Sequence, residues 1–125
     1  MTDEIIKLYK NAGIEPKYVK GENLMGYSYG TLKYLPFTAE KQIEIVKAIS
    51  TNYIRGYYDY RYLRIDREEI YEEIYLYLCI DSTRYHAHDK DFAVALAKLV
   101  NLIWHDLTKE EKEYIRGILK EGEAE

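Results

Sequence analysis

Three histidines and one cysteine are the side chains of this sequence best suited to binding a metal or attacking a substrate. His86 and His88 stand two positions apart, so on a β-strand they would share a face and could chelate Zn²⁺ if a third ligand joined them. The other interpretation is that both lie on the outer face of an edge strand and that Asp89 caps a following helix. We expect the second, with no metal site, and a metal-dependent phosphoesterase or nuclease using His86 and His88 is the alternative.

Nucleophilic chemistry has little support in the sequence. Cys79 is the single cysteine, and it lies inside an apolar run, where a thiol is normally inert packing. The chain has no GxxxxGK[ST] or GxGxxG loop, and it has no pair of His-x-Ser/Thr motifs. We therefore expect a protein that binds a partner, is not an enzyme and needs no cofactor.

Tyrosine and arginine are concentrated in the middle of the chain. Of the 15 tyrosines, nine lie between residues 53 and 85, together with five of the six arginines. Both side chains combine a large contact area with directed hydrogen bonds, so they anchor protein interfaces, and they also suit nucleotides through stacking and phosphate pairing. The alternative is that the tyrosines only cover a sheet by pairing across strands. The residues expected to bind a partner are Arg55, Tyr57, Tyr58, Tyr60, Arg61, Tyr62, Arg64, Tyr75 and Tyr77.

An acidic run follows the tyrosine- and arginine-rich stretch. Residues 66–73 carry five carboxylates against Arg67, a local charge of −4. Such a run is more often a solvated turn than a docking site, although it could face a basic partner. The whole chain also carries a net charge of −4, which argues against direct non-specific binding of nucleic acid, because such binding requires a basic face.

The N-terminal part is expected to place a helix and a hairpin before a second helix. Thr2 can cap the first helix, whose inner face holds Ile5, Leu8, Tyr9 and Ala12. Gly13 provides its C-terminal stop. Two short β-prone pieces, 25–29 and 31–35, are expected to form a hairpin joined at Gly30. Thr38 caps the second helix, and the predicted buried stripe is Ile43, Val46 and Ile49, with Ile45 beside it.

The middle of the chain is expected to form three strands. Residues 57–65 alternate, so that Tyr58, Tyr60 and Tyr62 point to one side. The segment 66–80 also shows a helical spacing, but its β-branched and aromatic run favours a strand over 73–81. A turn then leads to a strand over 83–88.

The C-terminal part is expected to hold the central core helix. Asp89 caps a helix over 90–105, whose Leu96, Val100 and Ile103 should pack against the sheet. Thr108 and Glu111 form a capping box for a last helix, with an inner face of Tyr114, Ile115, Ile118 and Leu119.

Together these segments predict an α+β fold: an antiparallel sheet of about three strands and a small N-terminal hairpin, layered with about four helices. We expect one domain over residues 1–125, divided into 1–37 (helix and hairpin), 38–51 (helix), 57–88 (Tyr/Arg-rich strands) and 89–120 (helices). The acidic N-terminus does not fit a signal peptide, and no apolar run is long enough to span a membrane. These features and the single cysteine predict a cytoplasmic protein with no membrane partner.

Two stretches resemble a known kind of protein. The string PFTAEKQ at 36–42 resembles a segment common in small orphan proteins of bacteriophages and prophages. The strings DFAxALA at 91–97, LxW at 102–104 and LTxEE at 107–111, followed by Ile115, Ile118 and Leu119, resemble the usual C-terminal half of such proteins. The resembling segments lie within residues 36–42 and 91–119 and involve helix starts and core positions.

The resemblance implies an accessory protein expressed in the infected host. Several proteins of this kind antagonise bacterial immunity, either as anti-CRISPR proteins that bind an effector or as sponges that sequester a signalling nucleotide. We therefore expect a phage-encoded inhibitor that acts in the host cytoplasm and binds a host defence protein stoichiometrically through the 53–85 region. The alternative is a nucleotide sponge that uses the same tyrosines and arginines.

Overall fold

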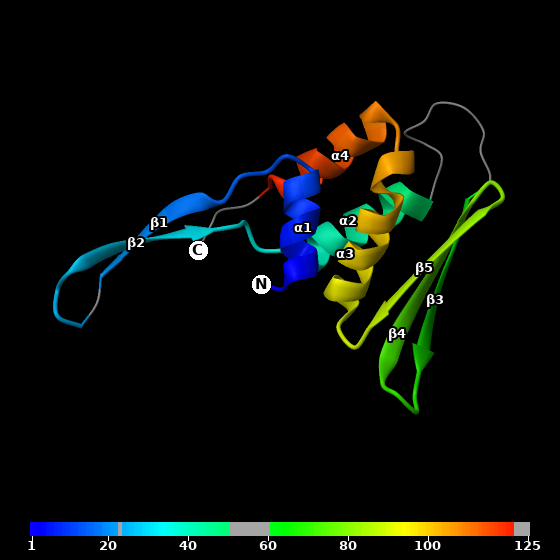
Figure 1. The fold of residues 1–125 in the computed structure, drawn as a ribbon, viewed down its shortest axis with the longest axis horizontal. Coiled ribbons are helices and arrows are strands. Elements are labelled where there is room, and N and C mark those ends of the chain that lie inside the picture. The colour runs from blue at the N-terminus through cyan, green and yellow to red at the C-terminus, as the bar shows by residue number, and fades with distance from the viewer. Residues whose placement is uncertain (23, 51–60, 122–125) are drawn as a thin grey trace.

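Within the residues that this computed structural model describes, 1–22, 24–50 and 61–121, four α-helices combine with two antiparallel sheets (Figure 1). This is the α+β fold that the sequence predicts. None of the described helices is long and apolar enough to cross a membrane. The elements are α1 (Asp3–Asn11), β1 (Lys17–Glu22), β2 (Ser28–Lys33), α2 (Ala39–Ser50), β3 (Arg61–Glu68), β4 (Glu73–Ile80), β5 (Thr83–Asp89), α3 (Phe92–Ile103), the 3₁₀ helix η1 (Trp104–Asp106) and α4 (Lys109–Leu119).

Helix α1 ends at the predicted glycine. Gly13 has φ +74°, in the left-handed region that glycine enters without a steric penalty. The Ile14 N–H donates to the Tyr9 carbonyl at 2.9 Å, and the Gly13 N–H donates to the Lys10 carbonyl at 3.0 Å. This pair of bonds is a Schellman motif, so the stop is confirmed. At the other end Thr2 occupies the N-cap position, but its side chain makes no capping hydrogen bond.

The N-terminal hairpin is displaced from its predicted position. It consists of β1 and β2, whereas strands over 25–29 and 31–35 were expected. Gly30 lies inside β2, opposite Lys20, and not in the turn. The glycine of the turn is Gly26, with φ +81°. The hairpin extends away from the helices along the long axis of the molecule (Figure 1).

Strands β3, β4 and β5 form an antiparallel sheet with β4 in the centre. The strands predicted over 73–81 and 83–88 are confirmed, and the helical alternative for 66–80 is wrong. The β-branched and aromatic run of β4 therefore outweighed its helical spacing. The strand expected over 57–65 is described from Arg61 onward and continues to Glu68, while residues 57–60 lie outside the described residues.

Helix α3 begins later than predicted. Its N-cap is Asp91, whose Oδ1 accepts a hydrogen bond from the Ala93 N–H at 2.8 Å. Asp89, the predicted cap, ends β5 instead: its Oδ1 accepts from the Asp91 N–H at 3.0 Å and its Oδ2 lies 3.1 Å from Lys98 Nζ. The backbone N–H of Asp91, followed by Lys98, lowers the pKa of the Asp89 carboxyl. Because the turn between β5 and α3 uses both aspartates, the helix starts only after the second one.

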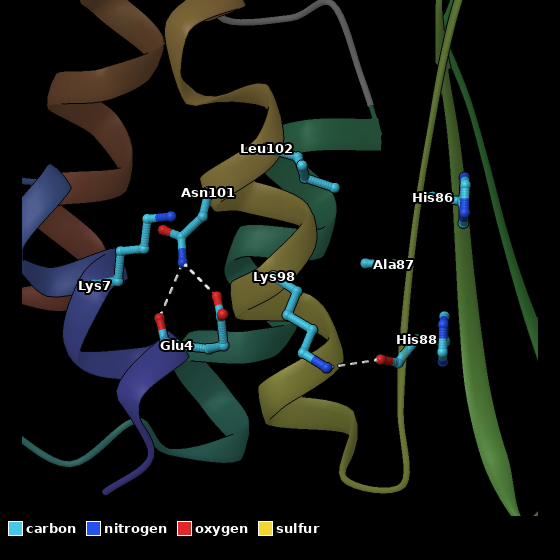
Figure 2. A pocket seen from close by; sticks show the side chains of 8 residues that line it. All are labelled: Glu4, Lys7, His86, Ala87, His88, Lys98, Asn101 and Leu102. Atoms are coloured by element: carbon cyan, nitrogen blue, oxygen red, sulfur yellow. Dashed lines mark hydrogen bonds between the residues drawn. The ribbon is translucent and has the colours of Figure 1, made fainter.

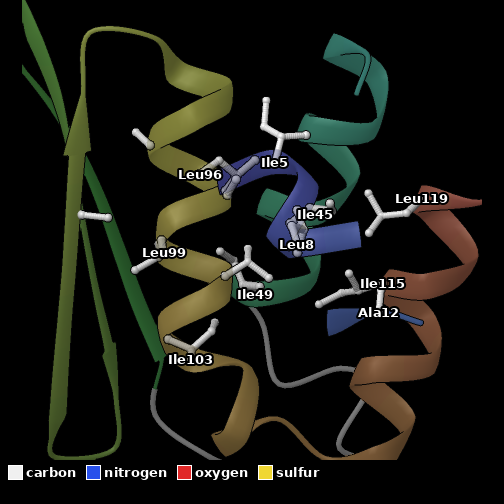
Figure 3. Packing of buried hydrophobic residues seen from close by; sticks show 14 of the residues in the cluster. Ile5, Leu8, Ala12, Ile45, Ile49, Leu96, Leu99, Ile103, Ile115 and Leu119 are labelled. Carbon is white, nitrogen blue, oxygen red and sulfur yellow. The ribbon is translucent and has the colours of Figure 1, made fainter. Parts of the chain in front are cut away.

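The hydrophobic core lies between the sheet and α3 and continues among the four helices (Figure 3). Helix α3 is central to it: Leu96, Leu99, Val100 and Ile103 are fully buried. On one side α3 packs against β4 and β5, and on the other it packs against α1 and α2. The predicted burial of Leu96, Val100 and Ile103 is confirmed, while their packing against the sheet stays a prediction. Each such side chain contributes about 1.5–3 kcal/mol through removal of apolar surface from water.

Helices α2 and α4 bury faces that differ in part from the predicted ones. In α2, Ile45 and Ile49 are buried, whereas Ile43, which was expected inside, is 54% exposed. In α4, Tyr114 is 45% exposed, and the carboxylate of Glu111 is buried in its place. The apolar residues of each helix allow two neighbouring faces, and the packing of α2 against α4 selects one of them.

Polar contacts link the ends of α2 and α4. The Lys41 N–H donates to Thr38 Oγ1 at 3.3 Å, which confirms Thr38 as the cap of α2. Lys41 Nζ donates to the Leu119 carbonyl at 3.1 Å, at the negative end of α4. Burial lowers the pKa of this amine. The capping box of Thr108 and Glu111 is also present, as predicted.

Candidate functional site

The most distinctive surface of the described chain is the face of the three-stranded sheet that points away from the helices. Figure 1 shows the helices on one side of this sheet. The strand register places the alternate residues of all three strands on the other side. We call this surface the open sheet face. Its residues are Tyr62, Arg64, Asp66 and Glu68 of β3, Glu73, Tyr75, Tyr77 and Cys79 of β4, and Arg84, His86 and His88 of β5.

Aromatic rings occupy the middle of the open sheet face. Tyr75 and Tyr77 of β4 stack with 6.2 Å between ring centroids and 13° between ring planes. On the neighbouring strand, His88 stacks on Tyr75 at 4.8 Å and His86 stacks on Tyr77 at 6.4 Å. These pairs follow directly from the register, because residues opposite each other on neighbouring strands share a face. The result is a preorganised group of rings.

Arg64 borders this group from the side of β3. Its guanidinium carbon lies 4.5 Å from the centroid of the Tyr77 ring, a cation–π geometry. Its Nε also lies 2.9 Å from Asp66 Oδ2, and both side chains are about half exposed, at 52% and 49%. Arg64 is therefore oriented by two contacts while much of its surface stays accessible to a partner.

Charge is distributed unevenly along the open sheet face. One end carries Arg64 and Arg84, with His86 beside them. The other end, toward the turn between β3 and β4, carries Glu68 and Glu73. A partner with the complementary arrangement, acidic at the first end and basic at the second, would be oriented by this pattern.

A hollow of about 650 Å³ lies at the cationic end of the face. Its lining includes Tyr62, Arg64, Tyr77, Arg84 and His86. Cys79 lies directly between Tyr62 and Arg84 in the register, and its side chain is much smaller than theirs. The surface is therefore lower at this position than around it, and we call this feature the Cys79 hollow. The thiol donates to the Asp81 carbonyl at 3.1 Å.

A hydrogen-bonded cluster occupies the acidic end of the face. Glu73 Oε2 accepts from the Tyr75 hydroxyl at 3.2 Å and lies 3.1 Å from His88 Nδ1. Desolvation, and then the carboxylate of Glu73, raise the pKa of the Tyr75 hydroxyl. Tyr75 consequently stays a neutral hydrogen-bond donor.

The structure brings together only some of the residues that the sequence assigned to partner binding. Tyr62, Arg64, Tyr75 and Tyr77 share the open sheet face. Four other residues of the predicted site lie outside the described residues: Arg55, Tyr57, Tyr58 and Tyr60.

The sequence assigned Arg61 to the partner-binding site, and the structure contradicts this assignment. It points to the helical side of the sheet, where its guanidinium group donates to Glu111 Oε2 and, at 3.2 Å, to the Ile49 carbonyl. The side chains of Arg61 and Glu111 are only 1% and 3% exposed. A buried arginine paired in this way joins β3 to α2 and α4 and does not reach a partner.

The two-histidine alternative gains little from the geometry. His86 and His88 point away from α3 while Ala87 points toward it, as expected for the outer face of an edge strand (Figure 2). Each ring stacks on a tyrosine. Within the described residues, no group of three or more His, Cys, Asp or Glu side chains could hold a metal ion.

The sequence also contains a Gly-x-Ser-x-Gly string at 26–30. In hydrolases this pattern places a nucleophilic serine on a sharp turn between a strand and a helix. Here Ser28 opens strand β2 of the N-terminal hairpin, and β2 continues to Lys33. The string therefore lacks the strand–turn–helix context that its chemistry requires.

A second concavity, of about 330 Å³, lies between α1, α3 and the edge of β5 (Figure 2). Its polar groups mostly bond to one another. Asn101 Nδ2 donates to the Glu4 carbonyl at 3.0 Å, and Lys98 Nζ donates to the His88 carbonyl at 3.1 Å. These bonds fasten α3 to α1 and to β5, so the concavity has a structural explanation.

The predicted binding site lacked seven residues of the open sheet face, among them the three of β5: Arg84, His86 and His88. Their period-2 spacing, in register with the tyrosines of β4, was the signal that could have identified them. The chemistry that the face offers is recognition, through stacked rings, forked guanidinium donors and one hollow. No protein-family model, curated protein or solved structure matches this chain.

Proposed function

We propose that this protein acts by binding a partner protein stoichiometrically through the open sheet face. The observation that carries the proposal is that this face presents tyrosine, arginine and histidine in an ordered array on the side of the sheet opposite the helices. Tyrosine and arginine dominate the anchor positions of protein interfaces, while lysine is depleted there. The open sheet face contains two arginines and no lysine.

The finer proposal is that the partner is a host defence protein and that the chain is a phage-encoded antagonist of bacterial immunity. It is supported by the resemblance of residues 36–42 and 91–119 to small phage and prophage proteins. A stoichiometric inhibitor needs a large, rigid recognition surface and no catalytic group. The stacked rings and oriented Arg64 supply that rigidity, which reduces the entropy lost on binding.

The test is capture of the partner from host lysate, followed by affinity measurement with variants. Tyr62, 54% exposed, is the best single probe, because it lies on the face without being part of the core. Tyr62→Ala should weaken binding by about 2 kcal/mol or more without changing stability. Tyr114→Ala is the matched control, since Tyr114 is 45% exposed but lies on α4. Equal affinities of the wild-type, Tyr62→Ala and Tyr114→Ala proteins would contradict the proposal.

The second candidate function is sequestration of a nucleotide, and the Cys79 hollow is the observation that favours it. Its volume of about 650 Å³ lies within the usual range of small-molecule sites. Arg64 and Arg84 could pair with phosphate oxygens, while Tyr62 could stack on a base.

Cys79 provides a direct test of this candidate, because it is the single cysteine of the chain. A cyclic nucleotide bound in the hollow should slow alkylation of the thiol, and at 100 times its dissociation constant it should add about 2.7 kcal/mol to stability. Arg84→Lys should reduce both effects, since lysine lacks the bidentate fork. Alkylation rates and melting temperatures unchanged by a panel of cyclic nucleotides would exclude those ligands and leave protein binding as the proposal.

A further inference from the structure

The N-terminal hairpin, residues 17–33, projects from the rest of the described fold, and we call it the arm. It extends away from the helices in Figure 1, and within the part of the chain that the structure describes its two strands pair only with each other. An isolated two-stranded hairpin is marginally stable in water and gains stability when a further surface covers it. The arm therefore has a physical reason to dock onto something.

One face of the arm carries exposed apolar side chains. Tyr18 and Leu32 are direct cross-strand partners and are 66% and 63% exposed. Leu24, in the turn, is fully exposed. Apolar side chains grouped in this way on a projecting element are typical of an interaction surface.

The charge of the arm indicates an acidic partner surface. Lys17 and Lys33 face each other directly across the two strands, and both are exposed. They lie on the face of the hairpin opposite Tyr18 and Leu32, while Lys20 shares the face of Tyr18. Like charges in this position repel, and an acidic group from outside would relieve the repulsion. The arm carries three lysines against Glu22, a formal charge of +2, within a chain whose total is −4.

The complementary surface lies at the other end of the same molecule. The turn between β3 and β4 and its flanks, residues 66–73, carry a charge of −4, and we call this segment the acidic tip. It also presents apolar side chains, with Ile70 83% exposed and Tyr71 68% exposed. Glu69 and Glu72 are exposed as well. The tip thus matches the arm in both charge and apolar character.

We propose that the arm of one molecule docks onto the acidic tip of a second copy of this chain. In Figure 1 the arm lies at the left and the sheet that carries the tip lies at the right, so the contact is between molecules. An antiparallel arrangement of two copies lets both arms engage both tips and closes the assembly as a two-fold dimer. Direct pairing of two arms along their strand edges is disfavoured, because Lys17, Lys20 and Lys33 would repel their counterparts.

A charge-swap experiment tests this dimer. The arm variant carries Lys17→Glu and Lys33→Glu, which keeps a like-charged pair across the strands and so leaves the internal repulsion of the hairpin comparable. The tip variant carries Glu69→Lys and Glu72→Lys. At low ionic strength, about 0.02 M, we expect sedimentation velocity to show wild-type dimers, and each variant alone should dimerise at least about tenfold more weakly.

Mixing the two variants should restore association, because each mixed contact again joins opposite charges. A control with Lys90→Glu and Lys109→Glu carries the same charge change as the arm variant at exposed sites elsewhere and should dimerise like the wild type. Circular dichroism checks that all variants are folded.

Three results would overturn the proposal: a wild-type protein that stays monomeric over the whole concentration series, a mixture that does not associate, or a control that is weakened as much as the arm variant. Open chains of many copies would overturn the closed two-fold arrangement. The experiment contains no partner protein or nucleotide, so its outcome is independent of the function proposed for the open sheet face.

Discussion

The two faces of the three-stranded sheet differ although they alternate along the same strands. On the inner face of β4, Leu76 and Leu78 are 0% and 1% exposed and contribute to the core. On the open sheet face, their neighbours Tyr75 and Tyr77 stack on each other and on histidines of β5. The even positions of β4 thus contribute to the core, and its odd positions form part of the open sheet face. Substitutions on the inner face should cost stability, and substitutions on the open sheet face should cost binding.

The largest stability effect is expected where a charge lies on the buried side of the sheet. Glu111→Ala would leave the guanidinium group of Arg61 buried without this carboxylate and would also remove the capping box of α4. Loss of one partner from a buried ion pair costs about 3–5 kcal/mol. Urea unfolding followed by circular dichroism measures the change, and Glu110→Ala, on the exposed side of α4, is the matched control. A loss below about 1 kcal/mol would mean that Arg61 can turn to solvent, which would return it to the candidate binding residues.

The next effect compares the two faces directly. Leu78→Ala removes a side chain that is 1% exposed and should cost about 2–5 kcal/mol, because the cavity it leaves cannot fully collapse. Tyr62→Ala on the other face should change stability by less than about 0.5 kcal/mol. Similar losses in the two variants would show that the open sheet face also stabilises the fold, and its assignment as a binding surface would lose its basis.

The sequence predicted those elements whose signals are local. The Schellman stop at Gly13, the capping box of Thr108 and Glu111, and the alternation in β4 each lie within a few residues. These short-range patterns restrict the backbone by themselves. The exposed and buried faces of β4 were therefore predictable without knowledge of the rest of the fold.

Features set by tertiary packing were not predictable in the same way. None of the described residues of the arm is fully buried, and β1 shows no apolar alternation, so Gly30 resembles the glycine of a turn in the sequence. The alternation of β3 already places Arg61 on the side of the sheet opposite Tyr62. What it does not show is the buried pairing with Glu111 of α4, which keeps Arg61 out of the binding surface. Ile43 and Ile45 are equally apolar, and the packing of α2 against α4 decides which one is buried.

A smaller effect is expected from Tyr9, which is fully buried. Among the described residues, its hydroxyl has no hydrogen-bond partner. Tyr9→Phe keeps the ring and its contacts with Tyr34 and Phe37 while it removes the unsatisfied group. We expect a gain of about 1 kcal/mol in urea unfolding at neutral pH. A loss of similar size would show that the hydroxyl has a partner in the folded protein.

The same residue has a pH signature. Burial raises the pKa of the Tyr9 hydroxyl from 10.0 to about 12. The unfolded chain therefore loses this proton first, so the stability associated with the neutral hydroxyl is complete below pH 10.0 and is lost as the pH rises toward about 12. The stability difference between Tyr9→Phe and the wild type should grow over this interval. A constant difference would contradict the burial of the hydroxyl.

The smallest effect is expected on the open sheet face, from the double variant His86→Ala with His88→Ala. Both rings lie on the side of β5 away from the helices, and Glu73 keeps its hydrogen bond from the Tyr75 hydroxyl when His88 is removed. Stability should change by no more than about 0.5 kcal/mol. Partner affinity should fall by more than stability does, because His86 lines the Cys79 hollow.

Metal analysis of the purified wild-type protein completes the test, since stoichiometric zinc that is lost in the double variant would make the two histidines ligands. That result would reverse the comparison of the two faces: the open sheet face would then hold a chemical centre that stabilises the fold, and the metal-dependent alternative would replace the binding proposal.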